Sequence, residues 1–283
     1  RLCSAPVCRR RPIEESAMLM RSIRQVRQWA RELRPTLTLA LPIVAGMVGQ
    51  MLMGLTDTIM VGRVGVIPLA ASAFVNAVVH VPFVLALGLL SSVAILTAQA
   101  FGAKQPSEAG EVLRHGLVMA TGAGVLSAIG LACLRPFLDR FGQPPEVAAA
   151  SGPYLVLFGA SLLPALIGQA CKQFSEALNR PWAPTLILLG AVLLNVLLNW
   201  ILIYGHWGAP ALGLEGAGWA TLSARLVMAV GLVCYVARDR ALRAFQPLCW
   251  HARLSGERLH RLITLGGPIA VQHLLEVGAF VLA

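Results

Sequence analysis

A single acidic residue lies inside the first long apolar stretch of the chain. Leu39–Gly62 holds 24 residues with one charge, Asp57, and about 20 mainly apolar residues are enough for a helix to cross a bilayer. A carboxylate at such a position costs at least ~2.5 kcal/mol, so intramembrane acids usually face a cavity and serve a function, such as proton exchange or cation binding. Asp57 lies near Gly62, in the outer half of the span. The alternative to a functional role is therefore a side chain that only extends to the lipid headgroups.

Helical spacing puts further polar and small residues on the same side as this acid. Gln50, Met53 and Asp57 follow one another at intervals of three and four residues, which places them on one stripe of a helix. Gly46, one turn before Gln50, extends the stripe with a residue that has no side chain. We therefore predict that Gln50 and Met53 line a cavity beside Asp57.

The composition is that of an integral membrane protein. Apolar residues make up 57% of the 283 positions and charged residues 13%, whereas a soluble domain carries about 25% charged residues. The six cysteines are scattered without a spacing for pairing or metal binding, so we interpret them as ordinary small residues. The formal charge of +10 could suggest a nucleic-acid partner, but the positions of the basic residues explain it by membrane topology instead.

Six apolar segments follow one another, and a seventh extends to the last residue of the sequence. They are far longer than the ~10-residue alternating segments of a membrane barrel, so we predict an all-α integral membrane protein. The segments cover approximately residues 37–61, part of 69–100, 112–134, 147–171, 182–204, 215–237 and 262 onward. This divides the chain into a basic segment 1–36, a six-helix lobe 37–237, a basic linker 238–261 and the first helix of a second lobe, 262–283. Residues 1–17 precede two alternative starts, Met18 and Met20, and are given no function.

A short repeat and the basic residues indicate how the segments are oriented. Leu39-Ala-Leu-Pro42-Ile43 recurs as Leu265-Gly-Gly-Pro268-Ile269, and an even number of spans separates the copies, as a parallel duplication requires. Of the 23 Lys and Arg, 19 fall on one side of the predicted array. Basic residues mark the cytoplasmic side of a membrane, so we expect a cytoplasmic amino terminus.

Four stretches resemble the multidrug and toxic-compound extrusion (MATE) family, in its bacterial NorM-like branch. They are LPIVAGMVGQMLMGLTDTIMVGRVG, AQAFGAKQPSEAGEVLRHG, LLNVLLNWILIYG with the following GAPALGLEGAGWAT, and GGPIAVQHLLEVGAF. The resemblance implies a twelve-helix protein of two six-helix lobes around a central cavity, truncated here after the start of the second lobe. It implies a multi-pass secondary transporter of the bacterial inner membrane, not an enzyme. Such a protein exports cationic or amphipathic drugs in exchange for inward-moving H⁺ or Na⁺, needs no further cofactor and works as a monomer when full length.

The resemblance also assigns coupling residues, by their places in the family's motifs. The acid of the first lobe falls on Asp57, the N-x-x-x-N/D pair of the fifth helix on Asn195 and Asn199, the threonine of the sixth helix on Thr221, and the acid of the seventh on Glu276. Na⁺ binding is possible at Asp57 or Glu276. Because related members carry an acid where this chain has Asn199, Asp57 alone can titrate in the first cluster.

The chemistry of these positions leaves alternatives open. Asn195 and Asn199 lie on one helix face and could supply oxygens to a cation or hydrogen bonds to a carboxylate, but they could also hold helices together. Glu276 falls near the middle of its span, where a charge is most costly. His273 is interpreted as a cavity-lining or packing residue. For Arg225 we expect a side chain that extends toward the membrane surface.

Two other functions remain in view at this point. A lipid or oligosaccharide flippase of the same superfamily would share the fold, but it should have a more cationic cavity, for which only Arg225 is available. An intramembrane enzyme is the more distant alternative, and the sequence contains neither G-x-S-x-G nor H-E-x-x-H.

The six-span arrangement predicts where two reporters must lie. A reporter fused after Arg240 should be cytoplasmic, because that position lies in the basic linker, and one fused after Trp207 should be on the opposite side. Paired fusions to alkaline phosphatase and green fluorescent protein measure this directly. Two fusions on the same side would contradict the arrangement.

Overall fold

The computed structural model describes residues 11–247, 250 and 254–282, and the side chains within 36–279. Its α-helices are α1 (Arg11–Gly62), α2 (Val66–Gly102), α3 (Pro106–Leu134), α4 (Pro145–Ala160), α5 (Leu162–Ala177), α6 (Trp182–Tyr204), α7 (Leu214–Arg238) and α8 (Gly256–Leu282). Three short 3₁₀ helices are η1 (Arg135–Phe141), η2 (His206–Gly208) and η3 (Arg243–Phe245). The described residues contain no strand, so the prediction of an all-α protein is confirmed.

Seven stretches of the described chain are long and apolar enough to cross a membrane, as predicted, and α4 and α5 together form one of them. Three helices begin well before the apolar pattern suggested, and one of them is α1, which begins at Arg11. α3 begins at Pro106 with Glu108 in its first turn, and α8 begins at Gly256 with Glu257 in its first turn. Proline and acidic residues are favoured in the first turn of a helix. Because neither belongs to an apolar run, the apolar pattern does not include the first turn.

The fourth span is broken into α4 and α5 at Ser161. Pro164 lies three residues further on, where its ring removes a backbone donor and crowds the carbonyl group of Ala160. The Ser161 hydroxyl donates to the carbonyl oxygen of Phe158 at 2.6 Å, which satisfies one of the acceptors near the break. The break therefore follows from the local sequence.

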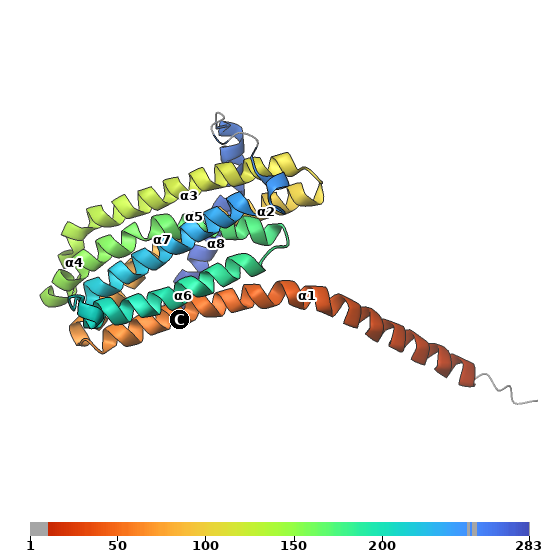
Figure 1. The fold of residues 1–283 in the computed structure, drawn as a ribbon, viewed down its shortest axis with the longest axis horizontal. Coiled ribbons are helices and arrows are strands. Elements are labelled where there is room, and N and C mark those ends of the chain that lie inside the picture. The colour runs from red at the N-terminus through yellow and green to blue at the C-terminus, as the bar shows by residue number, and fades with distance from the viewer. Residues whose placement is uncertain (1–10, 248–249, 251–253, 283) are drawn as a thin grey trace, which may run out of the picture.

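The helix ends gather at two opposite ends of the bundle (Figure 1). The α2–α3 and α5–α6 turns lie at one end, together with the end of α7, and the α1–α2 and α6–α7 connections lie at the other. Each end has its own hydrophobic cluster. Leu90, Phe174 and Leu232 belong to the first cluster, and Val75 and Tyr154 belong to the second. On α7, Thr221 and Arg225 fall between Ala217 of the second cluster and Leu232 of the first.

Hydrogen bonds join α1 to α6 near both ends of their contact. The Thr185 hydroxyl lies 3.0 Å from the carbonyl oxygen of Pro42 and 2.8 Å from that of Pro181, so its one hydrogen is shared between the two. The Tyr204 hydroxyl donates to the carbonyl oxygen of Met60 at 2.9 Å. Early residues of α6 thus meet early residues of the spanning part of α1, and late residues meet late ones. The two helices therefore run parallel, and their register is set at two separated points.

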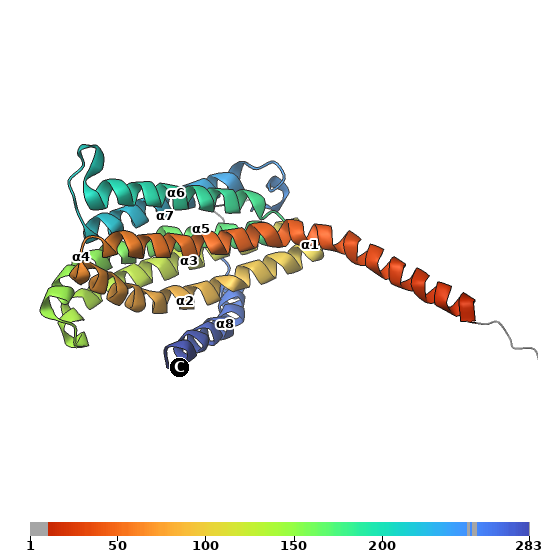
Figure 2. The same ribbon diagram turned by 90° about the horizontal axis from the view of Figure 1, so that it is seen from below.

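Helix α8 crosses the other helices steeply and packs on α2 (Figures 1 and 2). Glycines allow the close approach. A Cβ atom at Gly266 would lie 2.4 Å from the carbonyl oxygen of Leu89, and one at Gly88 would lie 2.3 Å from the Cα atom of Ala270. Small residues at such crossings let helix backbones pack closely within membranes.

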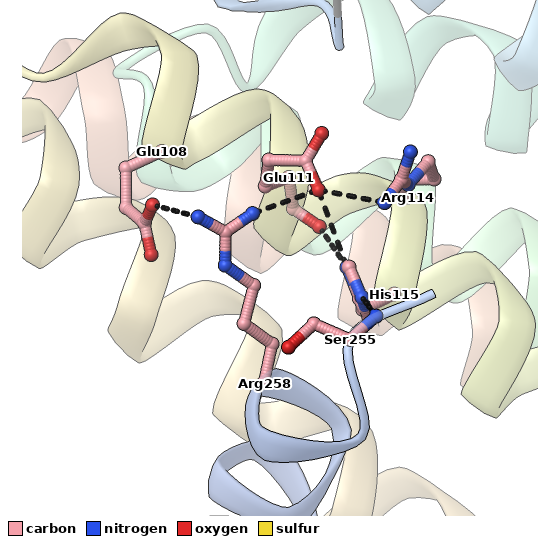
Figure 3. A network of polar contacts seen from close by, with 6 residues as sticks. All are labelled: Glu108, Glu111, Arg114, His115, Ser255 and Arg258. Carbon is pink, nitrogen blue, oxygen red and sulfur yellow. Dashed lines mark hydrogen bonds and ion pairs between the residues drawn. The ribbon is translucent and has the colours of Figure 1, made fainter. Parts of the chain in front are cut away.

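An ionic network ties the start of α8 to α3 (Figure 3). The Arg258 guanidinium bridges two acids of α3, with Nη2 at 2.9 Å from Oε2 of Glu108 and Nη1 at 2.8 Å from Oε2 of Glu111. Arg114 contacts the same Glu111 oxygen at 2.8 Å. Bridging by one guanidinium is directional, so the network fixes the position of the first turn of α8 on α3.

Buried His115 completes this attachment (Figure 3). The backbone N–H of Ser255 donates to Nε2 of His115 at 3.0 Å, and Nδ1 lies 2.8 Å from the carbonyl oxygen of Glu111. Because Nε2 accepts a hydrogen bond, Nδ1 carries the hydrogen and the ring is neutral. The residue just before α8 is thus held to α3 through the imidazole.

Substitution of two adjacent glycines tests the packing of α8 on α2. Gly266→Ala should destabilise the protein by about 1–3 kcal/mol, because the new methyl group meets the backbone of α2. Gly267→Ala is the matched control, since nothing lies within 4 Å of its Cβ position. Reversible unfolding in mixed micelles measures both. Equal stabilities for the two variants would contradict the packing described here.

Candidate functional site

Four of the residues singled out from the sequence meet in one place. Asp57 comes from α1, Asn195 and Asn199 from α6, and Thr221 from α7. The Nδ2 group of Asn199 donates to Oδ1 of Asp57 and, at 3.2 Å, to Oδ1 of Asn195. Nδ2 of Asn195 lies 3.5 Å from the hydroxyl of Thr221. We call these four residues the Asp57 cluster.

Three of the four residues of the Asp57 cluster are shielded from solvent, and Asp57 itself is half-buried. Asn195 and Asn199 are fully buried, and Thr221 is nearly so. The Oδ1 atom of Asn199 has no hydrogen-bond partner among the described residues. An unpaired oxygen next to a carboxylate can accept from a protonated Asp57 or bind a small cation.

The carboxylate of Asp57 opens on a cavity of about 210 Å³. Gln50 and Met53 line it beside Asp57, where the helical stripe placed them. The other lining residues are Gly54, Asn76, Phe83, Phe158, Ala165, Gln169, Leu188, Ala191, Val192, Ala224, Arg225 and Met228. Asp57 and Arg225 are the two charged side chains among them, so one negative and one positive group share the space.

The position of the Arg225 side chain differs from the one expected from the sequence. It lies in the middle of α7, and its side chain stays in the bundle instead of extending toward the membrane surface. Nη1 donates to the hydroxyl of Ser161 at 2.8 Å, and the guanidinium lies 4.7 Å from the ring centre of Phe158. Both partners lie at the break between α4 and α5, which no pattern within α7 could reveal.

Glu276 and His273 lie away from the Asp57 cluster, on α8. Nε2 of Gln272 donates to Oε1 of Glu276 at 3.0 Å, and Nδ1 of His273 lies 3.3 Å from Oε2. The side chain of Glu276 is 53% exposed, and neither residue lines the cavity at Asp57. Within this chain, therefore, Glu276 belongs to a separate group of polar residues.

Two polar residues of the cavity were not predicted as site residues. Asn76 interrupts the second apolar segment, and Gln169 lies in the fourth. Both are uncharged polar residues within apolar spans, the same signal that singled out Gln50. The aromatic walls, Phe83 and Phe158, carry no such signal, because phenylalanine is common in every apolar helix.

Comparisons with known proteins agree with this geometry. The family model MatE matches residues 42–201. The chain is 37% identical over 254 residues to the "Probable multidrug resistance protein NorM" of Rhodopseudomonas palustris, covering 89% of the chain and 53% of the relative. It is 30% identical over 251 residues to the protein of that name from Neisseria meningitidis serogroup B, covering 88% and 55%. The chain thus spans about half the length of the curated relatives that it matches.

Solved structures show the same fold. The eukaryotic MATE transporter AtDTX14 superposes with a TM-score of 0.79 at 21% identity, covering 88% of this chain and 54% of that one. The MATE transporter VcmN of Vibrio cholerae, in its bent form, gives 0.78 at 24% identity, covering 88% and 55%.

Double-mutant cycles test whether the Asp57 cluster acts as a unit. Asp57→Ala and Asn199→Ala should be non-additive in their effect on unfolding free energy, with a coupling of about 0.5–3 kcal/mol, because the two side chains share a hydrogen bond. The cycle of Asp57→Ala with Asn76→Ala is the control, since Asn76 lines the same cavity outside this chain of hydrogen bonds. Additive effects in the first cycle would contradict the cluster.

Proposed function

The chain belongs to the MatE family, and from that premise we propose that it forms the amino-terminal lobe of a drug exporter driven by an inward-moving cation. The proposal assigns residues 37–237 to this lobe, residues 238–261 to a cytoplasmic linker and residues 262–283 to the first helix of a second lobe. The family is one of transporters and not of enzymes. The name "multidrug resistance protein" carried by the relatives supports drugs as substrates.

The Asp57 cluster is the observation that carries this proposal. A carboxylate among buried amides, on the wall of a cavity, can exist in a charged and a neutral form with different partners. The charged form attracts a cationic group, and the neutral form does not. Exchange then follows from competition between substrate and coupling ion for one charge, as the two lobes alternate in exposing the cavity.

Either H⁺ or Na⁺ fits the groups that are present. A proton needs only the Asp57 carboxylate. Within the described residues, no three side chains of His, Cys, Asp and Glu come together, so Na⁺ would be held by that one carboxylate with neutral oxygens. The unpaired Oδ1 of Asn199 and the Thr221 hydroxyl are of the right type, since hard cations prefer oxygen ligands.

The second lobe completes the proposal. We expect its helices to cover Glu276, which is half exposed in this chain, and to form the opposite wall of the cavity. The protein would lie in the bacterial inner membrane as a monomer, with its amino terminus in the cytoplasm. The cavity of this lobe carries one arginine balanced by one aspartate, which does not favour a flippase for anionic lipids.

Replacement of the titratable group tests the proposal in the two-lobe protein. This means residues 1–261 of this chain joined to a second six-helix lobe, for example that of the Rhodopseudomonas palustris relative. Asp57→Asn should insert at the same yield but reduce gradient-driven efflux of a fluorescent cation to background, because the exchangeable charge is lost. Asn199→Asp should be tolerated better. Efflux from loaded vesicles under an imposed pH gradient, then under a Na⁺ gradient, measures activity and identifies the ion.

Asp139→Asn is the matched control, because this exposed acid lies in η1, outside the cavity. The chain of 283 residues expressed alone should give no efflux, since one lobe forms one wall. Unchanged efflux of Asp57→Asn at equal expression would reduce Asp57 to a structural acid.

A further inference from the structure

A second cavity lies where the first turns of α8 meet α2 and α3. Its volume is about 270 Å³, and it shares no lining residue with the cavity at Asp57. One part of its wall is apolar, with the buried side chains of Leu96 and Leu262. The other part is polar and includes the exposed side chains of Gln99 and Arg261. A ligand of this cavity should therefore be amphipathic.

The wall changes from polar to apolar on each of the three helices. On α8, Arg261 is followed directly by Leu262, where the apolar run of that helix begins. On α3, Glu108 precedes Val112 by one turn, and on α2 the apolar run ends within the wall, at Ala100. In a membrane protein such a change marks the depth at which the hydrocarbon gives way to the lipid headgroups. The cavity thus lies at headgroup depth.

Arg261 carries the uncompensated positive charge of this wall. The neighbouring Arg258 is occupied, because its guanidinium bridges Glu108 and Glu111 (Figure 3). Among the described residues, no ion pair or hydrogen bond is found for the guanidinium of Arg261, which has five N–H donors. The ligand should therefore bring an anionic group.

A neighbouring cavity continues this space along α8. It has a volume of about 250 Å³, shares Leu96, Gln99 and Arg261 with the first cavity, and adds Thr264 and Leu265. The two added residues follow Arg261 by about one turn, in the direction of the apolar run. The space extends from the free guanidinium toward the hydrocarbon, and a small soluble anion would leave that part unfilled.

We propose that these two cavities bind an anionic phospholipid of the phosphatidylglycerol class. The lipid phosphate would bind the free donors of Arg261, and the headgroup hydroxyls would exchange hydrogen bonds with the amides of Gln99 and Gln105. The first methylene groups of the acyl chains would pack on Leu96 and Leu265. The proposal does not depend on drug export, because the cavity at Asp57 takes no part in it.

The charge of the wall selects among headgroups. Its charged side chains are two arginines and one glutamate, so the wall carries a net positive charge. A phosphatidylglycerol headgroup neutralises this charge, whereas a choline headgroup brings a further cation to it. Because the lipid would contact α2 and α8 together, its binding should also stabilise the attachment of α8 and raise the melting temperature.

Lipid binding is measured on the chain of 283 residues in nonionic micelles, because this chain contains every lining residue of both cavities. Native mass spectrometry titrates dioctanoyl phosphatidylglycerol and the matched phosphatidylcholine. Phosphatidylglycerol should bind more tightly. Arg261→Gln should weaken its binding about tenfold, as expected for loss of a charge-assisted hydrogen bond. Arg243→Gln is the matched control and should change nothing, because this exposed arginine of η3 lies outside both cavities.

A second variant, Ala103→Phe, tests the cavity without changing its charge. Ala103 lines the first cavity, is exposed and has a helical backbone conformation, so a phenyl ring can be introduced there without backbone strain. The ring should occupy the space and weaken binding of phosphatidylglycerol, while the melting temperature without lipid stays the same.

Equal affinity of the unchanged chain for the two lipids would overturn the proposal. Equal weakening by Arg261→Gln and Arg243→Gln would overturn it too, because attraction to a basic surface as a whole predicts that result. Unchanged binding in Ala103→Phe would place the lipid elsewhere. Equally strong competition by glycerol 3-phosphate would indicate a site for free phosphate and reject the lipid. If Arg261→Gln does not fold, Ala103→Phe and the preference between the lipids decide.

Discussion

The constraint on which this lobe depends is the carboxylate of Asp57 within an apolar bundle. A charge there must be paired or hydrogen-bonded, because an isolated buried charge is costly. Its partner Asn199 comes from α6, and Asn195 of the same helix extends the chain of hydrogen bonds to Thr221 on α7. Three helices must therefore keep one relative rotation and depth. Contacts of the Thr185 and Tyr204 side-chain hydroxyls with backbone carbonyl oxygens of α1 hold α6 against α1 in that register.

The division of the hydrophobic core follows from the same constraint. Each end of the bundle has its own cluster of buried apolar side chains, and the polar groups with their cavity lie between the clusters. The two apolar cores hold the helices together, so the region between them can accommodate charged side chains, amide side chains and a cavity. The break at Ser161 belongs to this middle region, because it supplies the hydroxyl that anchors Arg225. The break between α4 and α5 thus positions the guanidinium of Arg225, which comes from α7.

Helix α8 is attached in two different ways. Against α2 it relies on the absence of side chains at Gly88 and Gly266, a contact in which van der Waals packing is dense. Against α3 it relies on Arg258 and on the neutral imidazole of His115, which are directional. Surface ion pairs add little stability, so the second attachment chiefly fixes where α8 begins. The first helix after the linker is thereby placed relative to the first lobe.

The sequence by itself determined the class of protein, the number of spans and much of the Asp57 cluster. Long apolar runs allow only helices across a membrane, and a carboxylate among them marks a site; spacing along one helix then predicts which neighbours share its face, as for Gln50 with Asp57 and Asn195 with Asn199. The link from α6 to Thr221 required the family pattern. Only the tertiary structure decided that Arg225 lines the same cavity as this acid, that Phe83 and Phe158 form part of its wall, and that Glu276 and His273 lie elsewhere. The reason is physical: periodicity relates residues on one helix, whereas contacts between helices depend on how each rotates and where it breaks.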